Sequence, residues 1–176
     1  MEKKKGVVWI STVLYVLIGL AIMASLLAVI RPKISEVKDK FVIDQTIQSL
    51  NTLDDTILRA REATGTKLNY IIRLDKGSLT IDGAKNTISW QALSDYQYSE
   101  ANKTIAIGKI KALTKPYASA WNVTLTLDYT GYNVNLTING NYNSAKTLMP
   151  AGTPYSIWIK NNGTRQGSQQ IDFSIA

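Results

Sequence analysis

The feature that most constrains this chain is an uncharged, proline-free stretch at residues 7–30, which reads VVWISTVLYVLIGLAIMASLLAVI. A helix needs about 20 apolar residues to cross a bilayer core of about 30 Å, so this stretch is long enough to span a membrane. Its few hydroxyl side chains can return hydrogen bonds to the helix backbone and do not prevent insertion. The stretch therefore predicts a transmembrane helix.

The residues on either side of this stretch bear on topology and processing. Three lysines precede it, and by the positive-inside rule they favour a cytoplasmic N-terminus, although basic residues at 31, 33, 38 and 40 oppose that inference. A secreted protein's signal peptide is the alternative. Its apolar region would be shorter, at about 7–15 residues, and would end in a small-residue cleavage site that this sequence lacks. A signal anchor fits the length better.

A second helical pattern follows the apolar stretch. Pro32 disfavours regular helix locally and predicts a kink or break. After it, apolar residues recur at helical spacing, which predicts an amphipathic helix over residues 32–63 whose stripe from 34 to about 58 packs on the rest of the protein. Gly65 is the expected C-terminal cap. The stripe consists of Ile34, Val37, Phe41, Ile43, Ile47, Leu50 and Ile57.

From residue 67 the period of the pattern changes to two, which is typical of strands. Strands are expected at 67–75, 78–82, 87–91, 105–113, 122–129, 132–138, 155–160 and 170–176. Thr130-Gly131 indicates a hairpin, and the Pro- and Gly-containing segment 146–154 indicates a loop. The fold class predicted is α+β, with a long N-terminal helix and an antiparallel β-sheet or β-sandwich head.

Composition argues against catalysis and against nucleic acid as a partner. The chain has no histidine and no cysteine, which removes the usual general base, the usual metal ligands and any thiol nucleophile. Asp54 and Asp55 are adjacent on a helix and point about 100° apart, which does not suit a shared site. The net charge is +7, concentrated at the two ends of the apolar stretch, which favours an anionic membrane surface over nucleic acid. We expect no enzyme activity, no cofactor and no metal.

The segment after residue 100 carries modification signals and aromatic residues. Four N-x-[ST] sequons make glycosylation possible at Asn102, Asn122, Asn135 and Asn162 if this segment is extracellular. The tryptophans and tyrosines of the predicted strands could bind glycans or nucleic acid by stacking. In alternating strands they more often pack in the core, which is our expectation here.

The N-terminal order of features resembles that of archaeal type IV pilin-like precursors with a class III signal peptide. The resemblance rests on Lys4-Lys5-Gly6, the apolar helix that follows at once, the amphipathic continuation and the β-rich head. It implies a leader at 1–6, a transmembrane and filament-core helix at 7–31, an amphipathic helix at 32–63 and an extracellular head at 64–176. It also implies that a prepilin peptidase cuts after Gly6, so that Val7 becomes the first residue. Bacterial relatives usually have Glu at the fifth mature position, where this chain has Ser11, which favours the archaeal group.

The resemblance implies a structural function with other copies of the chain as partners. A single-pass precursor, with its N-terminus in the cytoplasm before processing, would assemble into an extracellular filament for adhesion, surface contact or motility. Small residues at helical spacing allow close helix approach in such a filament or in a bilayer. These are Gly19, Ala21, Ala24, Ser25 and Ala28. The alternative is a membrane-anchored surface protein with a β-rich binding head that does not polymerise.

Overall fold

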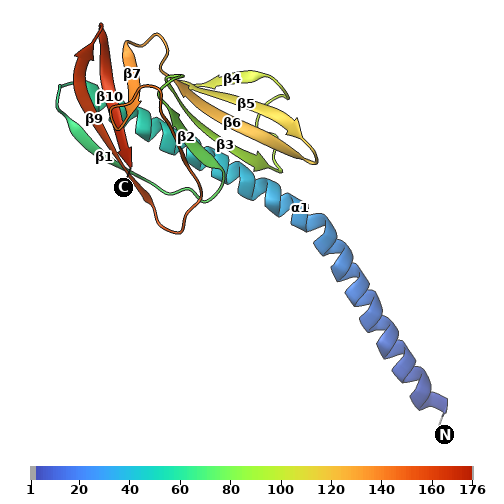
Figure 1. Cartoon of the computed structure of the whole chain (residues 1–176). Helices are drawn as coiled ribbons and strands as arrows, with labels where there is room; N and C mark the ends of the chain where they lie inside the picture. Colours follow the sequence, from blue (N-terminus) through green and yellow to red (C-terminus); the bar gives the residue numbers. More distant parts are fainter. Residues whose placement is uncertain (1–2, 176) are drawn as a thin grey trace.

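The computed structural model describes residues 3–175, which form one long helix followed by ten strands in two sheets (Figure 1). The helix leads into a β-rich head and extends far beyond it toward the N-terminus. This α+β arrangement, with antiparallel pairing throughout except for one pair of strands, confirms the fold class predicted from the sequence.

Helix α1 is continuous from Lys3 to Arg61 and contains Pro32 in its interior. A break at Pro32 is therefore not present, and one helix runs across the expected boundary between residues 31 and 32. Figure 1 shows α1 changing direction gradually as it leaves the head. A proline inside a helix removes one backbone hydrogen bond, and on an exposed helix the remaining bonds on either side keep the helix intact.

The end of α1 differs from the prediction. The helix ends at Arg61, so Gly65 lies beyond it and is not its cap. Gly65 has a φ of 87° and its N–H donates to the Asn161 carbonyl at 2.8 Å. Its left-handed backbone, which glycine adopts without strain, turns the chain from the helix into the first strand.

The smaller sheet has the strand order β1-β9-β10-β7. Strands β9 and β10 form a hairpin at its centre, β1 pairs antiparallel with β9, and β7 pairs parallel with β10. The strands are β1 (Lys67–Ile72), β7 (Val134–Ile138), β9 (Tyr155–Arg165) and β10 (Ser168–Ile175).

The larger sheet has the order β4-β5-β6-β3-β2-β8 and is antiparallel throughout. Its strands are β2 (Ser78–Asp82), β3 (Thr87–Ser94), β4 (Thr104–Ile107), β5 (Ile110–Tyr117), β6 (Ala120–Asp128) and β8 (Ala145–Leu148).

Three strand predictions require correction. The single strand expected at 105–113 is a tight hairpin, because Ile107 pairs with Ile110 across a turn in which Gly108 has a φ of 60°. The loop expected at 146–154 begins only after β8, which pairs with β2 and buries Leu148. The hairpin expected at Thr130-Gly131 is absent, because β6 and β7 belong to different sheets and the segment crosses between them.

The C-terminal half of α1 packs against both sheets and completes the core. Ile43, Ile47, Leu50 and Ile57 of the predicted stripe are buried, and Leu53 and Ala60 join them. The first part of the stripe is not covered: Ile34 is 48% exposed, Val37 68% and Phe41 67%. The prediction that the stripe packs on the sheets from residue 34 onward is therefore wrong for these three residues.

Candidate functional site: the uncovered helix and its attachment to the head

The N-terminal half of α1 is the most unusual surface of the described structure. Every large apolar side chain from Trp9 to Ile30 is exposed, and the most apolar window of 18 residues has a mean hydropathy of 2.8 with none of it buried. This helix is long and apolar enough to cross a membrane. In water its exposed area would strongly favour association, because removing apolar surface from water is favourable by roughly 25 cal/mol per Å².

The predicted small-residue positions all lie on this uncovered part of the helix. Gly19, Ala21, Ala24, Ser25 and Ala28 are exposed. The Ser25 hydroxyl donates to the Ala21 carbonyl at 2.8 Å, so its polarity is satisfied within the helix. A side chain added at Gly19 would meet no atom within 4 Å. In the described part of the structure these five positions are exposed, so a neighbouring helix could approach them closely.

The predicted processing site lies in the first turns of α1. Lys4, Lys5, Gly6 and Val7 have helical backbone, and their side chains lie outside the described part of the structure. Met1 and Glu2, which begin the predicted leader, lie outside the described residues.

The apolar character of the exposed helix continues past the span. Ile34, Val37 and Phe41 are exposed, whereas Asp39 and Ile43 of the same turns are buried against the head. The helical repeat therefore places the three apolar residues on the side of α1 that faces away from the sheets. We call Ile34, Val37 and Phe41 the outer apolar face.

Two buried aspartates attach the covered half of the helix to the larger sheet and the segments that border it. Asp39 forms an ion pair with Lys76 and accepts a hydrogen bond from the Asp95 backbone N–H at 2.7 Å. Four turns further on, Asp54 pairs with Lys109 at 2.8 Å and accepts from the Tyr129 hydroxyl at 2.9 Å. Burial, and then the Asp54 charge, raise the pKa of Tyr129 above its ordinary value. Each aspartate has its partners, so these residues fasten the helix to the head.

The C-terminal end of α1 is held by side chains of the smaller sheet. The Asn161 amide donates to the Ala60 carbonyl at 3.1 Å, and the Gln169 amide donates to the Arg61 carbonyl at 3.0 Å. Arg61 returns a hydrogen bond to Gln169 at 2.7 Å. The last carbonyls of a helix lack partners within it, so β9 and β10 perform the capping that the sequence assigned to Gly65.

A further contact between the helix and the smaller sheet comes from β1. The Tyr70 hydroxyl donates to the Ser49 carbonyl at 2.7 Å, and burial raises the pKa of Tyr70 to about 12. The neutral form is thus favoured in the folded protein. This tyrosine contributes stability below pH 10 that is lost as the pH rises toward 12.

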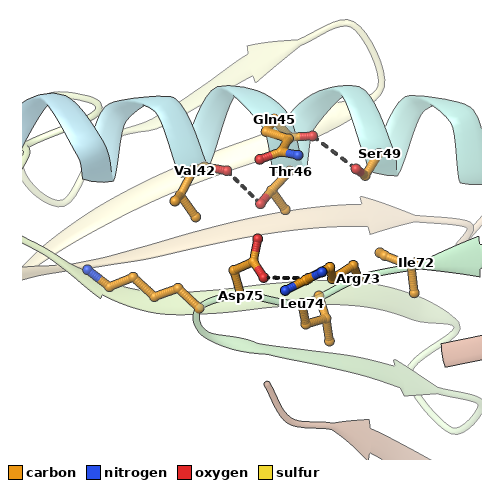
Figure 2. A pocket seen from close by; sticks show the side chains of 9 residues that line it. Val42, Gln45, Thr46, Ser49, Ile72, Arg73, Leu74 and Asp75 are labelled. Carbon is orange, nitrogen blue, oxygen red and sulfur yellow. Dashed lines mark hydrogen bonds and ion pairs between the residues drawn. The ribbon is translucent and has the colours of Figure 1, made fainter. Parts of the chain in front are cut away.

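The pocket between α1 and the β1–β2 connection is too small for a ligand. Figure 2 shows Val42, Thr46 and Ser49 of the helix facing Leu74 and the Arg73–Asp75 ion pair. Its volume is about 20 Å³, which is room for about one water molecule. Among the described residues no group of three or more Asp, Glu, Cys or His side chains could hold a metal ion.

Larger hollows lie on the surface of the head around β7. One of about 220 Å³ contains Tyr142 and Arg165, whose guanidinium lies 5.4 Å from the tyrosine ring centre. Another, of about 300 Å³, lies beside it and shares Asn135.

The predicted sequons differ in accessibility. Asn102 and Asn162 are exposed, whereas Asn122 and Asn135 are partly buried on strands β6 and β7. Modification of the first two would meet less steric hindrance.

The tryptophans follow the core expectation only in part. Trp90 is buried and donates to the Lys76 carbonyl at 3.0 Å. Trp121 and Trp158 are half-buried, and the Lys67 amine lies 4.5 Å from the centre of the Trp158 ring.

The sequence analysis did not predict the attachment role of Asp39 and Asp54, because it assigned only apolar residues to the stripe that packs on the head. A signal was present: Asp39 lies four residues before Ile43, and Asp54 four residues after Leu50, so both fall on the apolar stripe. A charge on such a stripe indicates a buried ion pair.

Taken together, the geometry defines a class of protein with one helix able to span a membrane and a two-sheet β head fastened to the end of that helix. Comparisons of the chain with protein-family models, with curated proteins and with solved structures gave no significant match.

Proposed function

We propose that this protein is a structural subunit of an extracellular, type IV pilus-like filament, anchored in the membrane by α1 before assembly. The observation that carries the proposal is the outer apolar face. The bilayer, its headgroup layer included, explains exposed apolar residues only to several ångströms beyond the span, and Phe41 lies eleven residues, or about 16 Å of helix, beyond Ile30. Apolar side chains at that distance, which face away from the head, can be buried by packing against α1 of another copy of the chain.

The remaining elements of the proposal agree with this role. The small residues of the span allow close helix contact. A prepilin peptidase would cut after Gly6 and leave Val7 as the first residue of the assembled subunit. The head would lie outside the cell, where it would serve adhesion, surface contact or motility. The fastening of α1 to both sheets would let the head follow the helix as one body into the filament.

The experiment replaces the outer apolar face in cells that have the secretion machinery. The double substitution Val37→Glu with Phe41→Glu should leave membrane levels unchanged, because both residues lie outside the span and outside the core. Filaments recovered by shearing should be lost, since buried unpaired charges are strongly unfavourable. Gln48→Glu, an exposed polar position of the same helix, is the control and should assemble normally.

A second substitution tests the span itself. Ala24→Phe adds bulk where helices would meet yet keeps the segment apolar, so insertion should persist while filaments are lost. Leu20→Phe replaces one bulky side chain with another and should be milder. Normal filaments from all these variants would refute the assembly role of α1. If the parent protein yields no filaments, a membrane-anchored surface protein that does not polymerise becomes the better hypothesis.

A further inference from the structure

The hairpin between β5 and β6 lies at the end of the larger sheet that is nearest the apolar span. Strand β3 ends beside it, and Asp95, just after β3, contacts Ser35 and Asp39 of α1. The opposite end of this sheet contacts the helix at Asp54, through Lys109 and Tyr129. The strands therefore run alongside α1, and Figure 1 shows the β5–β6 end beside the point where the helix leaves the head.

Residue spacing gives the height of this hairpin above the span. Ser35 and Asp39 lie about 6 and 12 Å beyond Arg31 along a helix that rises 1.5 Å per residue. Tyr117 pairs with Ala120, one step past the Trp121–Ser94 pair, and the turn extends about 3 Å further. The tip is therefore on the order of 5 Å from the end of the span, within the headgroup layer that adds several ångströms to each side of the hydrocarbon.

The residues of the tip suit that layer. Tyr117 is 57% exposed, Trp121 is half-buried and Leu93 at the end of β3 is 48% exposed. Tyrosine and tryptophan are enriched at membrane–water interfaces. The turn residues are Ala118 and Ser119, where hairpins in water favour Asn and Gly. The turns at the opposite end of the strands are more polar and contain Lys85 and Lys109.

Basic residues lie within about 10 Å of the tip, measured along the helix axis. Lys115 lies on β5 two residues before Tyr117, and Arg31 and Lys38 lie on the exposed helix. Of the acidic residues nearby, Glu36 is paired with Lys33 and Asp39 with Lys76, while Asp95 accepts a hydrogen bond from Ser35. A basic excess beside exposed aromatic residues is the composition that binds anionic lipid surfaces.

We infer that the tip of the β5–β6 hairpin docks into the interfacial layer of the anionic bilayer that α1 spans, with Tyr117 and Trp121 as its anchors. The head of the unassembled protein then has two attachments to the membrane and a fixed orientation on it. This inference rests on membrane anchoring by α1 and does not require filament assembly.

The test uses the full chain in nanodiscs of phosphatidylcholine and phosphatidylglycerol that hold one copy each. Because the chain contains no cysteine, a single cysteine can carry an environment-sensitive fluorophore. Ser119→Cys places it at the tip, and Thr130→Cys, exposed at the far end of β6, is the matched control. Headgroup-level spin-labelled lipid should reduce emission from position 119 by about twofold and leave position 130 unchanged.

A second pair of variants tests the anchor. Tyr117→Asp should abolish quenching at position 119, whereas Tyr132→Asp, which changes a tyrosine that is 51% exposed and lies outside the tip, should not. An unquenched probe at 119 while Trp9 is quenched would overturn the docking and leave membrane anchoring intact. Shielding of the probe only in discs that hold two copies would also overturn it, in favour of contact between copies.

Discussion

The two halves of α1 share one backbone and one direction but are stabilised in different ways. In the C-terminal half, Leu50, Leu53 and Ile57 are completely buried and two aspartates are fastened to the head. In the N-terminal half, Trp9, Leu20 and Met23 are more than half exposed. Packing within the chain holds the first region, and the second depends on what surrounds it. An apolar side chain in the C-terminal half should therefore contribute to the folding stability of the head. The same type of side chain in the N-terminal half should instead determine which surroundings the helix occupies.

Truncation should produce the largest difference between the halves. A chain that begins at residue 34 loses the span and keeps the covered helix, so it should be soluble and folded. A chain that begins at residue 67 also loses five large buried apolar side chains of the helix, each stabilising by about 1.5–3 kcal/mol, and exposes the apolar faces they cover. Thermal unfolding and light scattering would measure this. Equal melting and solubility of the two chains would contradict the packing of α1 on the head.

A single leucine in each half gives the next largest difference. Leu50→Ala should lower the free energy of unfolding of the head by about 2–5 kcal/mol, because Leu50 is fully buried and its loss leaves a cavity. Leu20→Ala removes the same atoms from an exposed site and should leave the free energy of unfolding of the head unchanged. Urea unfolding of the full chain in detergent, followed by head fluorescence, would compare them. A similar loss in both variants would show that the exposed half also supports the head.

The adjacent aspartates test the attachment with a matched pair. Asp54→Ala leaves Lys109 and the buried Tyr129 hydroxyl without their acceptor and should destabilise the head by about 1–3 kcal/mol. Asp55→Ala, at an exposed position, should change stability by less than about 0.5 kcal/mol. The denaturant midpoints of the two variants would measure this difference in stability. Equal midpoints would show that Asp54 does not help to hold the helix on the head.

The smallest effect is expected at acidic pH, on the side of the head that bears Asp128. Hydrogen bonds from Lys111 and Thr130 lower the pKa of Asp128 to about 2. Because the folded pKa lies below the unfolded value of about 3.9, the pair stabilises the protein above pH 4 and loses this contribution as the pH falls toward 2. The Lys111 side chain is 56% exposed, so solvent screens the pair and the effect should be smaller than those above. The stability difference between Asp128→Asn and the parent should vanish near pH 2, and a constant difference would assign it to another cause.

The parts of the fold that depend on local pattern could be predicted from the sequence. The span, the buried residues from Ile43 to Ile57 and most strands follow from periodicity. Periodicity does not indicate how far along the helix the sheets of the head extend, so the exposure of Val37 and Phe41 could not be predicted. Thr130-Gly131 correctly indicates a turn, but turn chemistry does not determine whether the chain returns to the same sheet.

The candidate site shows the same division. The apolar span could be predicted, since length and composition alone determine it, and the packing role of its small residues stays a prediction. The fastening of α1 by Asp39 and Asp54 depends on partners distant in sequence, such as Lys109. Which end of the larger sheet lies nearest the span depends on strand pairing and on contacts distant in sequence, such as that of Asp95 with Asp39, which single-sequence patterns do not fix.

The way α1 is held along its length determines how the molecule responds to tension. Contacts at Asp39, Ser49, Asp54 and the helix end are spread over more than 20 residues and reach both sheets. A pull along the helix axis loads them in shear, so they must yield together. A pull at right angles would peel them apart one after another. The attachment of the head should therefore withstand a larger force along the helix axis than at right angles to it.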